Sequence, residues 1–538
     1  MRVYYLFDAA RRTRLNQAGI DDTCAYIPAI LHFLGVTGNP IAPDQLDSLT
    51  EADVLFAART PLPALPCTVI SFAASQDPAV VYEKKIYAHL LVKEMALPIF
   101  SPVCPECACS ETCAYAQLED GTEVPALGRS GKRYDFFFDL PASIWYSGDG
   151  FPNEESKKLF SIGIGRVPEF RPLPLAHDAS VAYNDELCWL LRSILLDAGV
   201  PMLHTLPPLE DGTIPDFALH FSGDDDHCSA SLNLTAALNM ESFGLPYHIN
   251  AMPLQGDFVM DRATYEELKA HGCETAIHSD FTTPPYTAQT QAEQIALFNK
   301  VFGEPPVTNV NHCFVQDGPI AERLTWLEEN HVLGDNGYYG EVAPDPTDIN
   351  AFNVTGFAFG TGFPRYTCAG TNQGNRVLGT VLLPVTYYEP RLDCSRYNNE
   401  PQLLWYLSES AANGRISQFF IHPHYLNPSY ECITSTFTAL KRIQSYIQEQ
   451  NYAVWYTTTN HATKFWHNRR ASTLEETTPG YWKLQAACPL TVILPDGATG
   501  ASCDGAPLAV TRRVIAGKAM NLAAILAAGE HTLVLTEI

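Results

Sequence analysis

The stretch that decides the fold is FALHFSGDDD, which runs from Phe217 to Asp226. Its apolar residues lead into a glycine and three consecutive aspartates, a pattern typical of a buried strand that delivers carboxylates to a loop. Adjacent like charges repel one another, so we expect a cation, a shared proton or open water to compensate for them. A bound divalent metal ion would supply the cation. The alternative is a solvated acidic turn or helix start.

Apolar runs and helical runs alternate regularly after this stretch. Helical periodicity occurs in TYEELKAHG, where Thr264 and Glu267 are spaced as a capping box, and again in AEQIALFNKVFG and AERLTWLEEN. Between and after these runs come the strand-like segments CETAIH, PVTNVNH, VLLPVTYY, RISQFFIHPH and YAVWYTTTN. About seven such units predict an α/β fold with a (β/α)7 barrel rather than an open sheet.

The chain has 538 residues, more than one hydrophobic core usually serves, so we expect several domains. Residues 1–130 predict a small flavodoxin-like α/β domain with a parallel sheet, in which a helical run ends near Met95. Residues 131–210 form a connecting segment, residues 211–475 the barrel, and residues 476–538 a small β domain that lacks helical periodicity.

The connecting segment contains one clear amphipathic helix, NDELCWLLRSILLDAG. Asn184 is its predicted cap, and Gly199 is its predicted end.

Composition and charge restrict the partners and the compartment. The net charge of -26 disfavours nucleic acid and anionic membranes as partners and suits a neutral or cationic substrate. The N-terminus lacks a secretory signal, and no apolar run reaches the roughly 18 residues of a membrane span. Fifteen scattered cysteines fit a reducing compartment, so we expect a cytoplasmic protein.

A cysteine cluster lies near the end of the N-terminal domain. Cys104, Cys107, Cys109 and Cys113 fall inside ten residues and could surround a structural zinc ion or an iron–sulfur cluster. The alternative is an exposed loop with free thiols.

Polar residues follow the apolar part of several predicted strands in the barrel. These residues are Asp224, Asp225, Asp226, His278, His312, Asp335 and His422. In a (β/α) barrel they gather at the carboxyl-terminal rim, although any isolated histidine can also be a satisfied loop residue. Aspartate and histidine can hold zinc with an open position for water, and a nearby carboxylate and imidazole can then move protons. The predicted reaction class is hydrolysis.

Three motifs resemble the polysaccharide deacetylase superfamily, carbohydrate esterase family four. They are SGDDD at Ser222 to Asp226, HSDFT within Glu274 to Thr282, and FFIHPH at Phe419 to His424. The similarity covers roughly Phe217 to His467. The segments FDLPASIWYSGDG, GRVPEFRPLP and YNDEL further resemble a subgroup of large multidomain deacetylase-like proteins.

The resemblance implies a distorted (β/α)7 barrel that removes an acetyl group from an N-acetylated sugar with a divalent metal ion, zinc first and cobalt or nickel as alternatives. It implies Asp224 as the base, Asp225 as a metal ligand, His278 as a metal histidine and His422 as the general acid. Since there are three aspartates, the pair can also shift to Asp225 and Asp226. Asp226, Thr282, Asp335 and His424 are further candidates for metal or substrate contacts.

The sequence departs from the family at two motifs. Thr282 stands where the family has its second metal histidine, and VNHC stands where the family has an Arg-x-Pro-x-Gly strand end. We expect His312 to complete the metal site. The alternatives are a barrel that only binds carbohydrate or acts as a scaffold, and a glycoside hydrolase. Trp455, Phe465 and Trp466 could stack on a sugar or pack a helix against the barrel. The oligomeric state is left open.

Overall fold

The computed structural model describes most of the chain. The described residues are 1–58, 62–74, 85–104, 109–149, 180–282, 284–316, 318–338, 356–357, 359–390, 392, 399–427 and 433–536. The motif GRVPEFRPLP and Cys107 lie outside them. No helix within these ranges is both long enough and apolar enough to cross a membrane.

The middle of the chain forms a parallel sheet built on β11 (Phe217–Asp224). One edge of β11 pairs with β12 and the other edge pairs with β20, and every residue of β11 is buried. β21 pairs with the first half of β11. The strands besides β11 are β12 (His248–Ala251), β15 (Glu274–Ser279), β16 (Thr308–Asn311), β17 (Gly334–Tyr338), β18 (Val381–Pro384), β19 (Tyr387–Tyr388), β20 (Ile416–Phe420) and β21 (Val454–Thr457).

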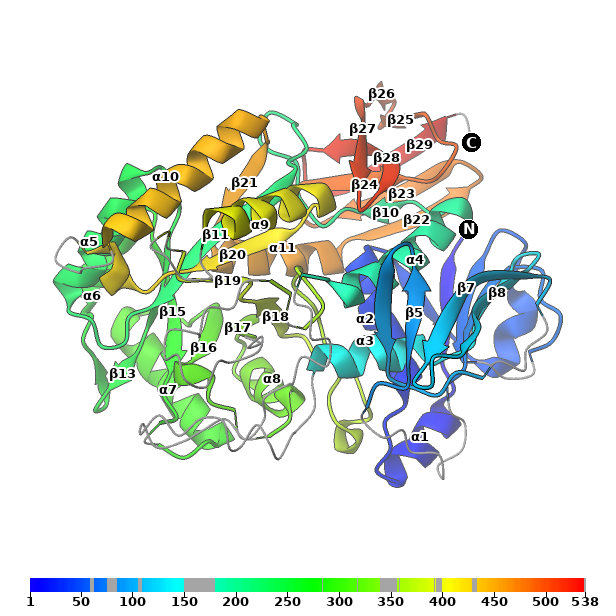
Figure 1. The fold of residues 1–538 in the computed structure, drawn as a ribbon, viewed down its shortest axis with the longest axis horizontal. Coiled ribbons are helices and arrows are strands. Elements are labelled where there is room, and N and C mark those ends of the chain that lie inside the picture. Colours follow the sequence, from blue (N-terminus) through cyan, green and yellow to red (C-terminus); the bar gives the residue numbers. More distant parts are fainter. Residues whose placement is uncertain are drawn as a thin grey trace.

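The segment 381–388 joins the two ends of this path of strands. Its first part, β18, pairs in parallel with β17, and its second part, β19, pairs in parallel with β20. The sheet therefore curls into a half-barrel, and the carboxyl ends of its strands face one rim (Figure 1). The predicted α/β class is confirmed, and the count of seven βα units stays a prediction.

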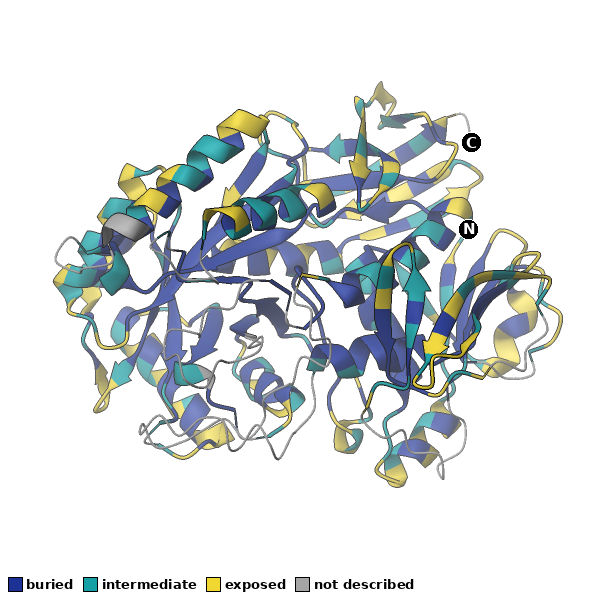
Figure 2. Cartoon of the chain, in the orientation of Figure 1, coloured by how far each residue is buried: buried dark blue, intermediate teal, exposed yellow. Residues whose placement is uncertain are grey.

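Helices follow the strands and lie outside the sheet, whose strands are buried between them (Figures 1 and 2). Helix α7 is capped at its N-terminus by Thr287, whose side chain accepts from Thr290 N, and at its C-terminus by Gly303, whose φ is +79°. Helix α6 is capped by Asp261, so the predicted capping box at Thr264 and Glu267 is wrong. The helices are α5 (Ala230–Ser242), α6 (Arg262–Ala270), α7 (Ala288–Phe302), α8 (Ile320–Glu329), α9 (Glu400–Asn413), α10 (Ile433–Gln450) and α11 (Thr459–Ala471), with a short hairpin of β13 (Pro253–Leu254) and β14 (Asp257–Phe258) before α6.

The N-terminal region contains a second sheet, and only half of it is parallel. Strands β2, β1, β3, β4 and β9 pair in parallel, whereas β8, β7, β5 and β6 are antiparallel. The strands are β1 (Val3–Leu6), β2 (Gly38–Ile41), β3 (Val54–Ala58), β4 (Thr68–Phe72), β5 (Ala88–Val92), β6 (Met95–Ile99), β7 (Glu111–Leu118), β8 (Glu123–Ser130) and β9 (Arg133–Phe136), with helices α1 (Ala9–Gln17), α2 (Ile27–Leu34) and α3 (Leu140–Asp149). The predicted fully parallel sheet is therefore wrong.

The prediction of a helix that ends near Met95 is also wrong for the residues that the structure describes. The chain turns at Lys93, whose φ is +55°, and the strands on either side pair with each other from Val92 and Met95 outward. Leu90, Leu97 and Ile99 are buried, so an apolar run with mixed periodicity is a hairpin whose inner face packs on the core.

Helix α4 (Tyr183–Asp197) confirms the predicted amphipathic helix of the connecting segment. Asn184 is not its cap, because it lies inside the first turn and its side chain donates to the carbonyl of Phe359 at 2.8 Å. The chain leaves the helix at Gly199, which has a φ of +88°.

The C-terminal region is all β, as predicted, and contains two small sheets. One sheet has the order β10-β24-β28-β27 and the other β22-β23-β29-β25-β26. Their strands are β10 (Met202–Leu203), β22 (Thr473–Thr478), β23 (Tyr481–Ala486), β24 (Leu490–Leu494), β25 (Gly500–Cys503), β26 (Ala506–Pro507), β27 (Val510–Ile515), β28 (Lys518–Ile525) and β29 (Gly529–Thr536). The apolar side chains of this region and of the N-terminal region share one core. The predicted domain boundaries stay a prediction.

Candidate metal centre

Five ionisable side chains meet at the rim of the half-barrel because parallel strands present their carboxyl ends at one edge. Asp224 ends β11, and Asp226 follows in a turn where its φ is +42°. His278 lies on β15, His312 directly follows β16, and His422 follows β20. The structure thus brings together five of the seven polar residues that the strand-end pattern selected, and these five come from four strands.

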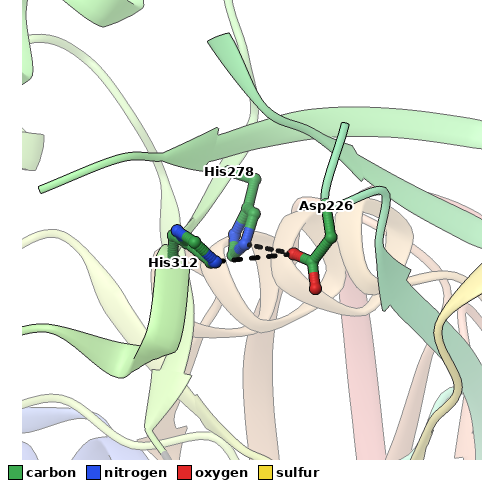
Figure 3. Close-up of side chains that lie close together, drawn as sticks. All are labelled: Asp226, His278 and His312. Carbon is green, nitrogen blue, oxygen red and sulfur yellow. Dashed lines mark ion pairs between the residues drawn. The ribbon is translucent and has the colours of Figure 1, made fainter. Parts of the chain in front are cut away.

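Two imidazoles face one carboxylate oxygen. The Nε2 atom of His278 lies 3.3 Å from Oδ1 of Asp226, and the Nε2 atom of His312 lies 3.9 Å from the same oxygen (Figure 3). The His278 side chain is fully buried, whereas the Asp226 side chain is 36% exposed. The group therefore opens toward solvent on the side of Asp226, as a site for a small-molecule reaction requires.

The hydrogen bonds of the two rings show which nitrogen carries the lone pair. Nδ1 of His278 lies 3.2 Å from the carbonyl of Val310, and Nδ1 of His312 lies 3.4 Å from Oδ1 of Asp280. Both partners accept hydrogen bonds, so Nδ1 is the donor in each neutral ring and Nε2 carries the lone pair. Among the residues that the structure describes, the buried Nε2 of His278 has no hydrogen-bond partner. In their neutral forms the two rings thus direct lone pairs toward a carboxylate, an arrangement that suits a cation.

The donor set fits a divalent metal ion. In a tetrahedral zinc site with bonds of about 2.0–2.1 Å, neighbouring ligand atoms lie about 3.4 Å apart, close to the separations of Asp226 from His278 and His312. The ligand atoms of all three residues lie within 4.8 Å of one another. Three protein ligands also leave a fourth position open, as in catalytic zinc sites.

The second oxygen of Asp226 faces a third imidazole. Oδ2 of Asp226 lies 3.4 Å from Nε2 of His422, and Asp224 belongs to the same group of potential ligands. On its other side, Nδ1 of His422 makes a short hydrogen bond with the buried carboxylate of Glu389. Burial lowers the pKa of His422, but the charges of Glu389 and Asp226 outweigh it and raise the pKa to about 9. His422 is therefore a proton donor at neutral pH.

Asp224 is held by a chain of buried polar groups. The side chain of Asn250 donates to Oδ1 of Asp224 at 2.8 Å, and Oδ1 of Asn250 lies 2.9 Å from Nε2 of His248. Nδ1 of His248 lies 3.9 Å from Glu274. Burial raises the pKa of Asp224, although the charges of His278 and His422 oppose this effect. A carboxylate with a raised pKa is suited to accept a proton.

Asp225 has different surroundings from those of its two neighbours. Its Oδ1 atom accepts from the backbone N–H of Met252 at 2.9 Å and from that of His227 at 3.3 Å. It belongs to none of the potential ligand groups found among the described residues. Burial raises its pKa to about 7. The geometry thus brings Asp226, rather than Asp225, to the imidazoles of His278 and His312.

Three other predicted site residues, Asp335, Thr282 and His424, contact neighbouring side chains. Asp335 is fully buried and forms a short ion pair with Arg323, so its carboxylate is neutralised within the barrel. Thr282 donates to Asp280 through both its hydroxyl and its backbone N–H. The ring of His424 stacks on that of His422 with centroids 5.2 Å apart.

Aromatic side chains near the end of the barrel pack in the core. Trp455, Phe465 and Trp466 are buried among the apolar residues shared by the N- and C-terminal regions. The alternative that they stack on a sugar is therefore wrong, and the packing alternative is right.

Two other groups of potential ligands are less suited to a metal. Of the cysteine cluster, Cys104, Cys109 and Cys113 form no ligand group within the described part of the chain. Cys503, Asp504 and His531 do form a group. However, Nδ1 of His531 faces Asp504 at 2.8 Å and Nε2 faces the carbonyl of Ala527 at 3.1 Å, so neither ring nitrogen offers a lone pair.

Comparison with known proteins gave matches only among solved structures: no protein-family model and no curated protein matches the chain. The matching structures include polysaccharide and peptidoglycan deacetylases and an acetyl xylan esterase. A Mycobacterium smegmatis protein assigned to the polysaccharide deacetylases is 12% identical, and the match covers 52% of this chain and 99% of that one with a TM-score of 0.33.

Two further structures match over similar lengths. A family 4 acetyl xylan esterase from Clostridium thermocellum, in complex with a cobalt ion, is 12% identical, with 46% and 91% of the two chains covered and a TM-score of 0.26. A peptidoglycan deacetylase from Bacillus subtilis is 10% identical, with 47% and 93% covered and a TM-score of 0.24. With TM-scores below 0.5, these likenesses do not define the activity of this chain.

Sequence reasoning missed three side chains that shape the centre. Glu389 directly follows the strand-like run VLLPVTYY, and Asp280 follows His278 by two residues, so the strand-end rule that selected the other residues would also have found them. Asn250 follows no charged motif and carries no such signal. Glu389 also has a φ of +47°, a conformation rare outside glycine that the sequence does not reveal.

Proposed function

We propose that this chain is a metal-dependent hydrolase that removes acetyl groups from N-acetylated sugars. The observation that carries the proposal is the convergence of the Nε2 atoms of His278 and His312 on Oδ1 of Asp226. The order of the three motifs along the chain, which resembles that of polysaccharide deacetylases, supports the substrate class. The net charge of -26 suits a neutral sugar and a cationic amine product.

Asp226, His278 and His312 would hold a divalent ion, zinc first and cobalt or nickel as alternatives. When bound, such an ion supplies Lewis acidity toward water and the acyl oxygen. In this proposal Asp226 takes the ligand role that the unshifted motif gives to Asp225. Asp224 keeps the role of base.

The protein side chains then move two protons. Asp224 accepts a proton from the attacking water, since burial raises its pKa and Asn250 fixes one of its oxygens. His422 donates a proton to the leaving nitrogen, and Glu389 keeps its imidazole oriented and protonated. The amide C–N bond breaks, and acetate and the free amine leave.

The test is acetate release from N-acetylglucosamine oligosaccharides by the full chain, first freed of metal and then given zinc, cobalt or nickel. We expect acetate only with added metal. The variant His278→Ala should release none, whereas Glu241→Gln, which alters an exposed carboxylate beside His271, should match wild type.

Two other outcomes would replace the proposal. Sugar binding without acetate release under any metal would favour a scaffold, the alternative that the substitution at Thr282 raises. New reducing ends without acetate would favour glycosidic bond cleavage.

A further inference from the structure

The segment from His278 to Thr282 holds one potential ligand and contacts another. His278 itself faces Asp226, and two residues later the carboxylate of Asp280 faces Nδ1 of His312 at 3.4 Å. His312 comes from the neighbouring strand β16 and reaches the centre through its other ring nitrogen. Asp280 therefore contacts the far side of an imidazole whose near side faces Asp226.

The carboxylate of Asp280 is fixed by the residue at the position where the family has a histidine. Thr282 donates to Oδ1 of Asp280 from its hydroxyl at 2.6 Å and from its backbone N–H at 2.9 Å. That same oxygen accepts from His312. An oxygen already held by two local donors presents a fixed direction to the ring.

The backbone of Asp280 is fixed as well. The side-chain amide of Gln294, on α7, accepts from Asp280 N at 2.7 Å and donates to Asp280 O at 2.7 Å. Gln294 is 8% exposed, so water competes little for these bonds. One buried amide thus anchors both polar groups of the residue that carries the carboxylate.

We propose that Asp280 is a positioning residue that fixes the tautomer and orientation of His312 for a metal ion, and that Thr282 fixes Asp280. The inference rests on the proposed metal site. A carboxylate that accepts from the far nitrogen of a metal-binding imidazole raises the ligand's basicity, and its loss typically costs about 10–100-fold in metal affinity. In this proposal Thr282 is not a metal ligand. It orients Asp280, which in turn orients His312, the histidine that takes the place of the family's second metal histidine.

The test measures Zn²⁺ affinity of the full chain by competition with a chromophoric chelator, together with the visible absorption of the Co²⁺ form. We expect Asp280→Ala to weaken Zn²⁺ binding about 10–100-fold and to change the Co²⁺ spectrum, with Asp280→Asn between it and wild type. Thr282→Val should weaken binding by a smaller factor in the same direction. Glu241→Gln removes a carboxylate that faces Nδ1 of His271 at 2.9 Å on the surface, and it should leave the affinity unchanged.

The outcomes separate this inference from the metal site itself. If His312→Ala binds Zn²⁺ as tightly as wild type, His312 is not a ligand and the proposed site fails. If His312→Ala loses affinity while folded Asp280→Ala and Thr282→Val keep that of wild type and an unchanged Co²⁺ spectrum, the site stands and the role of Asp280 is wrong. Should Asp280→Ala not fold, Thr282→Val and Asp280→Asn decide by the same two measurements.

Discussion

Acidic residues have different partners in the N-terminal region and at the rim of the half-barrel. In the N-terminal region, Asp22 pairs with Arg11 and Arg12, each at 3.2 Å. Asp139, which follows β9, accepts from the hydroxyl of Thr23 at 2.6 Å and from the N–H of Ala142 at 2.9 Å. These carboxylates are satisfied by cations or neutral donors of the protein itself.

At the rim of the half-barrel the carboxylates face imidazoles instead. His278 lies 3.3 Å from both Asp224 and Asp226, and within the described ranges no lysine or arginine pairs with either aspartate. Inside the same half-barrel, Asp335 pairs with Arg323. The lack of a lysine or arginine partner among the described residues is therefore specific to the aspartates at the rim. The difference teaches that strand-end position brings acidic groups together, whereas the available partners decide whether the group is structural or open to a metal ion.

The largest expected effect comes from removing the carboxylate that the imidazoles share. Asp226→Asn should reduce bound zinc from one ion per chain to none and lower kcat/KM by at least about 10,000-fold, because Lewis acid and nucleophile are lost together. Metal content and acetate release on the same sample check this. Full zinc content in this variant would show that Asp226 is not a metal ligand, and the proposed difference between the rim and the N-terminal region would be wrong.

The next effect separates proton donation from metal binding. His422→Asn should lower kcat by about 100- to 10,000-fold, the usual contribution of a general acid, while zinc content stays at one ion per chain. Steady-state kinetics with metal analysis measure both. A loss of zinc equal to that of Asp226→Asn would make His422 a ligand and not an acid.

The next effect concerns the N-terminal region, where protein side chains pair with the carboxylates. Asp22→Ala should destabilise the protein by about 3–5 kcal/mol, since it leaves the buried guanidinium of Arg11 without this partner, and the folded fraction should bind zinc as wild type does. Chemical denaturation with metal analysis tests it. Unchanged stability, or lost zinc, would show that the two regions are not distinct in the way described.

The smallest effect is a pH dependence in the N-terminal region. Burial raises the pKa of Asp139 to about 6, above its value of 3.8 in the unfolded chain, so the folded state holds this proton more tightly. Stability from this group therefore falls as the pH rises from about 4 to 6 and is constant above that range. The stability difference between wild type and Asp139→Asn should fall by up to about 3 kcal/mol across that interval. A difference independent of pH would contradict the assignment.

Much of the site was predictable because strand ends are visible in sequence. The apolar runs before Asp224, His278, His312 and His422 are each long enough to indicate a strand, and parallel pairing then places their ends at one rim. Asp335 met the same rule and proved structural, because its partner Arg323 lies on the preceding helix α8 and the pairing depends on tertiary packing.

The features that the sequence did not predict correctly also depend on tertiary packing or on local backbone conformation. The sequence predicts a helix where the structure has the hairpin at Lys93, since an apolar run of mixed periodicity does not distinguish a helix from a strand. Which of three adjacent aspartates faces the imidazoles depends on the turn at Asp226, where φ is +42°, and local sequence does not specify that turn. The relation between Glu389 and His422 joins residues 33 positions apart through strand pairing.

Anomalous scattering at the zinc absorption edge, from crystals of the full chain soaked in zinc, tests the central claim most directly. We expect one strong peak between Oδ1 of Asp226 and the Nε2 atoms of His278 and His312, at about 2.0–2.2 Å from each. A fully soaked crystal with no peak there, or with zinc bound only elsewhere, would contradict it.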